Sequence, residues 1–221
     1  MTLSGKLFAL FPAIHISSIL ASFYLLCSRG EAKYLLLFLT TIYALPVICF
    51  RVLTLIKPMN EGVSDILSKD FSPWWAGHQM QSLFIAVPAL EAILKIIPGF
   101  YSFWLRCWGS KIGKNVYWTP GVLNYDRNLL EVGNGVIFGE QSLTVCHVIT
   151  PKKGQGLLKI SKVRIGDSAF VGAGSVISPG VTMDKGTFVK AGERIYPHWH
   201  ITKEGTIKPA RKKEEVKDDI K

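Results

Sequence analysis

A six-residue repeat in the C-terminal half of the chain restricts its fold more than any other feature. An aliphatic residue returns at every sixth position, at Ile165, Val171, Ile177, Met183, Val189 and Ile195. A small or β-branched residue and a glycine recur at fixed places between them, at Ala169, Ser175, Val181 and Thr187 and at Gly174, Gly180, Gly186 and Gly192. A strand that turns after every six residues, with one inward aliphatic side chain and a glycine where φ is positive, predicts a parallel β-helix. Each turn would bury its apolar residue only against neighbouring turns.

The repeat also resembles that of a known family. Written in sixes it reads IGDSAF, VGAGSV, ISPGVT, MDKGTF and VKAGER, which is similar to the left-handed β-helix, or hexapeptide-repeat, acyltransferases. The resemblance implies a left-handed coil, which departs from the right-handed rule for parallel crossovers. The same fold carries γ-class carbonic anhydrases and non-catalytic assembly subunits, so the fold alone does not define a function.

The limits of the repeat divide this half of the chain. A β-helix is predicted over 111–200, with a slip around 124–130 where a bulge or small loop is expected. The repeat breaks again after Leu143, and a lysine- and glycine-rich insertion predicts a loop near 150–162. This loop would project from the coil, because its backbone cannot join the strand ladder. The residues that remain, 201–221, are predicted to form a solvated charged tail.

The N-terminal part, 1–57, contains two long uncharged segments. The first runs from Leu7 to Cys27, and the second runs from Tyr34 to Phe50 and continues beyond Arg51. Because about 20 apolar residues cross a bilayer as a helix, two transmembrane helices are predicted. A cleaved signal peptide is the alternative for the first segment. Its apolar part is longer than the roughly 7 to 15 residues of such peptides, and no A-x-A site follows.

The basic residues give an expected orientation. Arg51, Lys57 and the basic remainder of the chain follow the second segment, and basic residues favour the cytoplasmic side. We therefore expect an integral protein of the inner (cytoplasmic) membrane, with both chain ends and the β-helix in the cytoplasm.

The segment 58–110 is predicted to be an interfacial, amphipathic helical linker. Five of the six tryptophans fall between residues 74 and 118, and tryptophan favours the headgroup level of a membrane. We expect helices that lie in the interface, with Trp104 and Trp108 covering the first coil of the β-helix. A third membrane span is the alternative. A proline and two charged residues within the segment argue against it, namely Pro88, Glu91 and Lys95.

The family resemblance implies a single histidine as general base, at or just before a projecting loop. His147 stands at this place, between the coil TVCHVI and the insertion. An imidazole can accept a proton near neutrality while an acceptor attacks a thioester, so neither a covalent intermediate nor a metal is required. Asp126 and Glu140 are the candidates to orient it, and Asp126 with Arg127 are alternatively contacts for the acceptor. A structural turn histidine is the other interpretation of His147.

The resemblance further implies an acyl-CoA or acyl carrier protein co-substrate, no permanently bound cofactor, and a homotrimer with active sites between subunits. The donor's pantetheine arm would lie along backbone in two turns of the coil, at Gly172, Ala173, Gly174, Lys190 and Ala191. The predicted function is transfer of an acetyl or longer acyl group to a hydroxyl or amine of a membrane-associated acceptor, such as a lipid or a lipid-linked or cell-surface glycan. The alternative is a non-catalytic membrane scaffold.

Composition argues against other classes of function. The four cysteines, Cys27, Cys49, Cys107 and Cys146, have neither metal-site spacing nor the pattern of a disulfide framework. A γ-carbonic-anhydrase-like zinc site would need three histidines on the coils, and the repeat, which fades after Ile195, offers His147 alone. The other histidines outside the apolar segments, His78, His198 and His200, are interpreted as structural or interfacial. The net charge of +10 comes without a recognisable nucleic-acid module.

Overall fold

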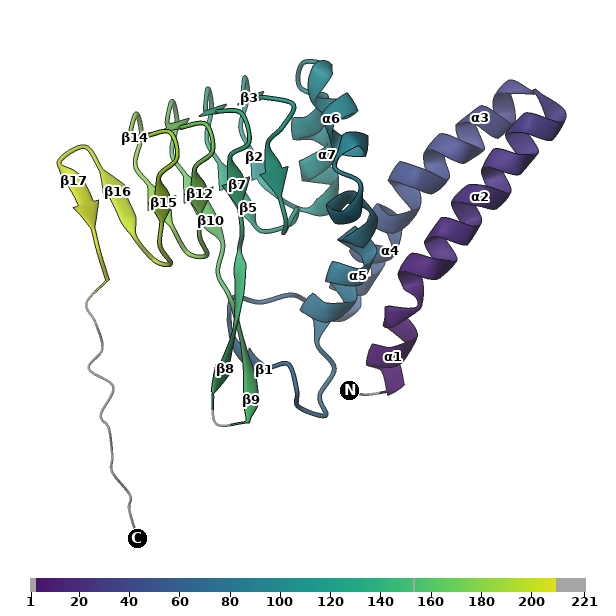
Figure 1. Cartoon of the computed structure of the whole chain (residues 1–221), viewed down its shortest axis with the longest axis horizontal. Helices are drawn as coiled ribbons and strands as arrows, with labels where there is room; N and C mark the ends of the chain where they lie inside the picture. Colours follow the sequence, from purple (N-terminus) through teal and green to yellow (C-terminus); the bar gives the residue numbers. More distant parts are fainter. Residues whose placement is uncertain (1–2, 153, 210–221) are drawn as a thin grey trace, which may run out of the picture.

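The computed structural model describes residues 3–152 and 154–209, in which a helical N-terminal part is followed by a coiled stack of short strands (Figure 1). The helices are α1 (Leu3–Ala9), α2 (Phe11–Arg29), α3 (Ala32–Leu39), the π-helical turn η1 (Thr40–Ala44), α4 (Leu45–Ile56), α5 (Pro73–Ala86), α6 (Ala89–Ile96) and α7 (Phe100–Trp108). The strands are β1 (Gly62–Asp65), β2 (Lys111–Ile112), β3 (Tyr117–Trp118), β4 (Leu123–Asn124), β5 (Leu130–Val132), β6 (Ile137–Phe138), β7 (Leu143–Thr144), β8 (His147–Lys152), β9 (Gln155–Ile160), β10 (Val163–Ile165), β11 (Phe170–Val171), β12 (Val176–Ile177), β13 (Thr182–Met183), β14 (Phe188–Val189), β15 (Arg194–Ile195), β16 (His200–Thr202) and β17 (Gly205–Ile207).

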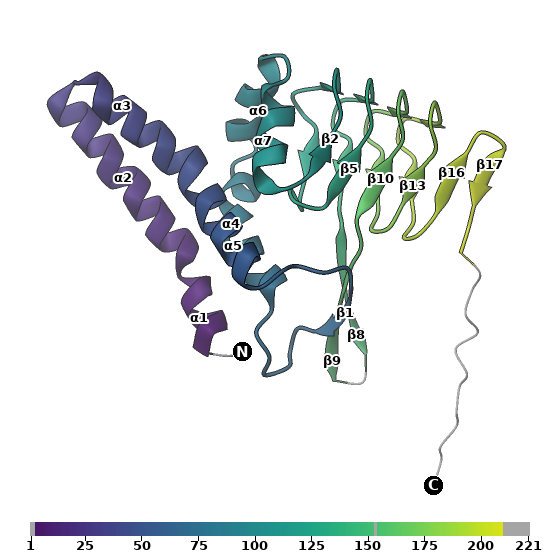
Figure 2. The same ribbon diagram turned by 180° about the vertical axis from the view of Figure 1, so that it is seen from behind.

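Three parallel sheets form the three faces of the coiled stack. The first face contains β2, β5, β10, β13 and β16 with β17 at its end (Figure 2). The second face contains β3, β6, β11 and β14, and the third contains β4, β7, β12 and β15. The chain visits the three faces in turn, so each coil takes one strand from each face. This is the arrangement of a parallel β-helix, as the repeat predicted.

The aliphatic positions of the repeat form the core of this stack. All six of them are at most 3% exposed, and residues three hexads apart stand side by side, as in the pairs Ile165↔Met183, Val171↔Val189 and Ile177↔Ile195. The glycines at the predicted turn positions have φ between +65° and +73°. Both features follow from a strand that turns after every sixth residue, since each turn needs one inward apolar side chain and one left-handed corner.

The backbones of neighbouring coils approach each other closely at a different glycine, Gly172. A Cβ atom at Gly172 would lie 2.4 Å from the backbone nitrogen of Ala191, whereas a Cβ at Gly174 would meet no atom closer than 4.0 Å. We expect Gly174→Ala to cost about 1–2 kcal/mol, the strain of a left-handed alanine. Gly172→Ala should cost at least about 2 kcal/mol more, because backbone atoms of the next coil must move. Denaturant unfolding of the two variants measures the difference, and equal losses would contradict the close packing of the coils.

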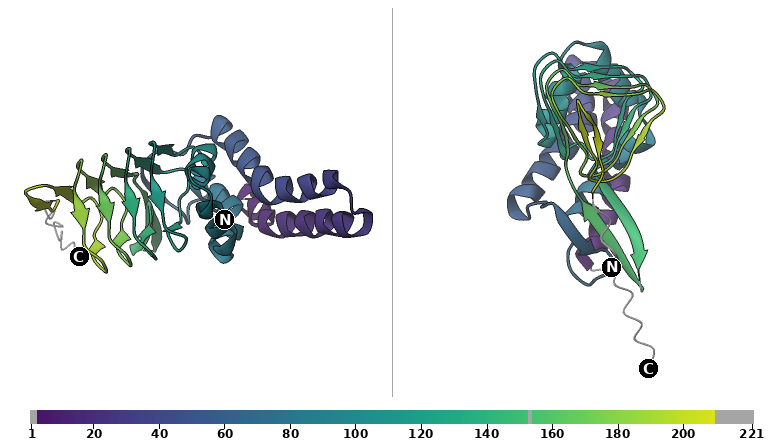
Figure 3. Two further views of the ribbon diagram at one scale, coloured as in Figure 1. Left: turned by 90° about the horizontal axis from the view of Figure 1, so that it is seen from above. Right: turned by 90° about the vertical axis from the view of Figure 1, so that its left-hand side faces the viewer.

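The two N-terminal apolar segments form helices that are long and apolar enough to cross a membrane. They cover Gly5–Arg29 and Ala32–Ile56, each of 25 residues, and lie antiparallel after a turn at Gly30, whose φ is +67° (Figure 3). Most of their side chains point outward, because only 11% and 28% of their most apolar stretches are buried. Helices α5 and α6 together are also long and apolar enough but are bent by 76°, so a third span would have to be broken.

The segment 58–110 is helical from α5 onward, whereas its first part contains the strand β1. Helix α7 covers the first coil: Trp108 is fully buried, and Trp118 Nε1 donates to Ser102 Oγ at 2.9 Å. Residues of β1, however, form a strand that pairs antiparallel with β9. The expected loop near 150–162 is the hairpin β8–β9, and the order β1-β9-β8 makes a small separate sheet that projects from the coils (Figure 3). The backbone of the hairpin therefore pairs within this sheet and not with the strands of the coils.

The chain after the repeat is more ordered than the predicted tail 201–221 suggested. Strand β16 adds to the first face, and β17 pairs with it antiparallel from Gly205 to Ile207, which closes the last coil. His200 lies on this coil and its Nε2 is 2.7 Å from an Asp184 carboxylate oxygen. Residues 210–221 of the predicted tail lie outside the described residues.

Candidate active site

The corner between the third and the first face brings Asp126 beside His147. Asp126 lies in the slip between β4 and β5, and His147 begins β8 one coil later. The parallel pairing Asn124↔Thr144 carries the two corners into contact, so that the backbone N–H of Cys146 donates to Asp126 Oδ2 at 2.8 Å. The irregularity that interrupts the repeat at 124–130 thus places a carboxylate at this position.

His147 Nδ1 lies 2.9 Å and 2.8 Å from the two carboxylate oxygens of Asp126. Trp74 of α5 also contacts the carboxylate, because its Nε1 donates to Oδ1 at 3.2 Å. Burial alone would raise the pKa of Asp126, but the hydrogen bonds from His147, Cys146 and Trp74 outweigh it and hold that pKa below its usual value. An ionised carboxylate only accepts, so Nδ1 is the donor in this contact.

Helix α5 supplies an aromatic wall to this pair. The Trp74 ring centroid is 4.5 Å from that of His147, and the His78 ring lies 5.0 Å from Trp74 and 6.1 Å from His147. Burial and then the neighbouring His147 lower the pKa of His78, which favours its neutral form. Sequence reasoning assigned His78 no role at this site. The only signal was its spacing from Trp74, since residues four apart share one face of a helix.

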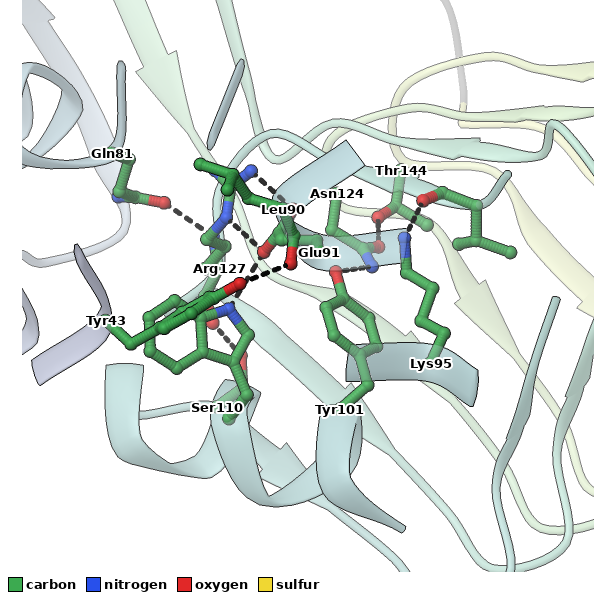
Figure 4. Close-up of polar contacts among 12 residues, drawn as sticks. Tyr43, Gln81, Leu90, Glu91, Lys95, Tyr101, Ser110, Asn124, Arg127 and Thr144 are labelled. Carbon is green, nitrogen blue, oxygen red and sulfur yellow. Dashed lines mark hydrogen bonds and ion pairs between the residues drawn. The ribbon is translucent and has the colours of Figure 1, made fainter. Parts of the chain in front are cut away.

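Arg127 follows Asp126 in the chain but belongs to a different network (Figure 4). Its guanidinium forms a bidentate ion pair with Glu91 of α6, with two N–O distances of 2.7 Å, and both side chains are 2% exposed. Trp104 Nε1 donates to the same carboxylate at 2.9 Å, and the backbone N–H of Arg127 donates to Gln81 Oε1. The network joins the helices to the first coil, and it engages the side chain of Arg127, which the sequence suggested as an acceptor contact.

A second part of this network lies beside the ion pair (Figure 4). Asn124 donates to the hydroxyl of Tyr101, and Thr144 donates to Asn124. Lys95 donates to the carbonyl oxygens of Pro120 and Val122 at 3.2 Å and 2.6 Å, and burial lowers its pKa to about 8. The helices therefore contact the first coil just before β4 and at Asn124, two residues before Asp126.

The other residues considered from the sequence meet at a different corner, between the second and third faces. Gly172, Ala173 and Gly174 lie between β11 and β12, and Lys190 and Ala191 between β14 and β15. They stack directly, since the N–H of Gly174 donates to the carbonyl of Glu140 and that of Gly192 to the carbonyl of Ala173, both at 2.8 Å. Within one chain the third face separates this corner from His147. Of the two candidate orienters, Asp126 is the one hydrogen-bonded to His147.

Other catalytic chemistry has less support at this site. The Cys146 thiol is buried, and burial raises its pKa well above the usual range, which makes it a poor nucleophile. Within residues 3–152 and 154–209, no three His, Cys, Asp or Glu side chains are grouped so that they could hold a metal ion. The arrangement at the corner is an imidazole hydrogen-bonded through Nδ1 to a buried carboxylate whose pKa is lowered, which suits proton removal from a hydroxyl.

Comparison with known proteins gives a partial relationship. No family model matches the chain. Its sequence is 32% identical over 92 residues to galactoside O-acetyltransferase from Lactococcus lactis subsp. lactis (strain IL1403), a match that covers 38% of this chain and 44% of that protein. The chain therefore spans less than half the length of the curated relative it matches.

Among solved structures, similar ones include a maltose O-acetyltransferase from Clostridium difficile 630, with 17% identity over 57% of this chain and 86% of that one and a TM-score of 0.36. A hexapeptide-repeat acetyltransferase from Vibrio cholerae has 14% identity, coverage of 53% and 86%, and a TM-score of 0.34. A galactoside acetyltransferase in complex with coenzyme A has 14% identity, coverage of 56% and 80%, and a TM-score of 0.35. Over the segment matched in sequence, the chain is a homologue of an O-acetyltransferase.

Proposed function

We propose that this protein is a membrane-anchored O-acyltransferase that moves an acetyl or longer acyl group from acyl-CoA to a hydroxyl of a membrane-associated acceptor. The observation that carries the proposal is the Asp126–His147 pair, with Nδ1 2.8 Å from the nearer carboxylate oxygen, at a corner of a β-helix built from hexapeptide repeats. The similarity to a galactoside O-acetyltransferase supports a hydroxyl of a glycan as acceptor.

In the proposed reaction, Asp126 keeps the proton on Nδ1 of His147, and Nε2 removes the proton of the acceptor hydroxyl. The acceptor oxygen attacks the thioester carbonyl, the carbon–sulfur bond of the tetrahedral intermediate breaks, and the leaving thiolate takes the proton from the imidazolium. The products are the acylated acceptor and free CoA, so no group remains on the enzyme. Asp126 also stabilises the imidazolium that forms, as a buried ionised carboxylate does beside a catalytic histidine.

The donor is proposed to lie at Gly172, Ala173, Gly174, Lys190 and Ala191. Because these residues lie at a different corner from His147, one subunit would combine its histidine with the donor corner of a neighbour. Assembly as a homotrimer with shared sites is thus part of the proposal and rests on the family resemblance. An acyl carrier protein is the alternative donor.

The test is transfer by the full chain, purified in detergent, with acetyl-CoA and longer acyl-CoA thioesters. Soluble sugars, alkyl glycosides and extracted membrane lipids serve as acceptors, with mass spectrometry of the products and release of free CoA as readouts. We expect an ester on the acceptor and an equal amount of CoA. If no donor, including an acylated carrier protein, supports transfer to any acceptor, the alternative of a non-catalytic membrane scaffold is preferred.

Membrane anchoring has a test of its own. We expect the protein to stay in the membrane pellet after washes with sodium carbonate and with high salt, because two apolar helices of 25 residues insert more firmly than a basic surface adheres. The measurement is the distribution of the full-length chain between pellet and supernatant. Release into the supernatant would refute the anchor and leave the chemistry at His147 untouched.

A further inference from the structure

A cavity of about 370 Å³ lies on the side of the N-terminal helices and reaches two neighbours of His147, while Asp126 and His147 themselves are not part of its lining. Two of the residues that line it, Trp74 and Ile160, are neighbours of His147: the Trp74 ring lies 4.5 Å from the imidazole, and Ile160 is the cross-strand partner of His147. We infer that this cavity binds the neutral polyhydroxyl head group of a lipid-linked acceptor and presents one hydroxyl to His147. The inference rests on the proposed function and names its acceptor class.

The pairing of the small sheet places the cavity on the correct side. Residues directly opposite in an antiparallel ladder project to the same face, and successive residues alternate. His147, Ile160 and Gly62 form one row across β8, β9 and β1, and Ser64 lies on the same face as Gly62. Ser64 also lines the cavity. Ile160 and Ser64 thus place part of the cavity on the sheet face that carries the imidazole, and Asp65, the last residue of β1, lines it at the end of the strand.

The lining suits a neutral sugar or polyol. Its polar side chains are hydroxyls, an amide and two carboxylates, at Asn60, Ser64, Asp65, Ser68, Asp70 and Ser72. Such groups exchange hydrogen bonds with hydroxyls, and the half-buried Phe71 ring offers apolar surface to the carbon side of a sugar ring. Lysine and arginine are absent from the described lining, while Asp65 and Asp70 are acidic. A phosphate or other anionic group in the cavity itself would therefore meet like charge.

The position of the cavity along the helices points to a lipid-linked form of this head group. Pro58, the first residue of the lining, follows the end of the second apolar helix at Ile56. A neighbouring cavity of about 310 Å³ shares Ser68, Asp70 and Ser72 with the first, and it includes Gly5, where the first apolar helix begins. Both cavities thus lie at the same end of the helical hairpin.

In a bilayer crossed by the two helices, this end lies at the headgroup level. The second cavity also has an apolar part, formed by Ile66, Leu67 and Trp75. It is suited to the first segment of an alkyl chain, since burial of each CH₂ group contributes about 0.8 kcal/mol. The acceptor would therefore enter from the membrane with its alkyl chain in the second cavity, beside α1, and its head group in the first cavity.

Ser64→Phe and Val63→Phe form a matched pair of variants that tests this assignment. Phenylalanine at position 64 would fill the cavity, whereas Val63 is 64% exposed and projects to the opposite face of the same strand. The acceptor is a long-chain alkyl galactoside in nanodiscs. We expect Ser64→Phe to raise the KM for this acceptor by about tenfold or more and to leave the KM for acetyl-CoA unchanged. Val63→Phe should leave both KM values unchanged. Equal acceptor KM values for the two variants would overturn the assignment.

Photolabelling gives a readout that does not depend on turnover. An alkyl galactoside with a diazirine on its chain should label peptides from 3–9 and 57–75, and the labelling should persist in His147→Ala and fall in Ser64→Phe. Labelling confined to the coils of the β-helix would overturn the cavity assignment. Transfer that Ser64→Phe leaves unchanged would overturn the cavity and leave the proposed function standing. Labelling of the cavity by a wild-type protein that transfers no acyl group would overturn the acceptor role together with the proposed function.

Discussion

Replacing His147 by alanine is expected to lower acyl transfer by about 10² to 10⁴-fold, the usual contribution of a general base. The loss should appear in kcat, because the imidazole acts on the proton that moves in the transition state and contributes little to binding either substrate. His147→Gln keeps some hydrogen bonding but cannot take the proton, so it should be as inactive as alanine. Near-normal transfer by both variants would rule out this mechanism.

The same variants should fold and insert normally, which separates catalysis from stability. His147 is at the edge of the coil, and in its absence the Cys146 amide and Trp74 still donate to Asp126. The pKa of Asp126 is lowered partly by His147, so its stabilising charge is present above the unfolded pKa of about 3.9 and is lost as the pH falls through the lower folded value. Loss of the imidazole raises that folded pKa. Acid unfolding of His147→Ala should therefore begin at a higher pH than that of the wild type.

The repeat made the coils predictable because its spacing is also their geometry. Val171 and Val189 had to point inward if the chain turns after every sixth residue, and both are at most 1% exposed. The glycines could be assigned to corners for the same reason. The two N-terminal helices were predictable from the length of their uncharged, apolar segments. His147 could be singled out because it stands where the repeat breaks.

The contacts around His147 were not predictable, because they join segments with no common period. Asp126 and Glu140 both preceded the insertion, and only the register of β4 with β7 brings one of them to the imidazole. Trp74 reaches the same carboxylate from a helix 52 residues earlier in the chain. Strand β1 was hidden within a linker expected to be helical, since four residues that pair with a distant hairpin leave no alternating pattern of their own. Local sequence patterns determine individual helices and strands, whereas pairings between distant segments depend on the tertiary structure.

The buried ion pair between Glu91 and Arg127 gives the largest expected effect on stability. Arg127→Met should lower the free energy of unfolding by about 3–5 kcal/mol, because it leaves the Glu91 carboxylate buried without its partner. Glu91→Gln should cost a similar amount by leaving the guanidinium unpaired. The double variant should recover much of the loss, since it buries no charge and the amide oxygen introduced at position 91 can still accept from Trp104. Denaturant unfolding of the four proteins measures the coupling between the two positions.

The exposed pair Glu31–Lys33, at 2.8 Å with side chains 53% and 63% exposed, is the matched control. Lys33→Met should cost no more than about 1 kcal/mol, as expected for a solvated pair. If Arg127→Met cost as little, the ion pair could not be what joins the helices to the first coil. The double variant also separates stability from function, because Arg127 follows Asp126 in the slip. If the double variant recovers stability while its kcat stays low and its acid unfolding begins at a higher pH, then the buried pair positions Asp126. Helix α6, which carries Glu91, would then control the geometry at His147.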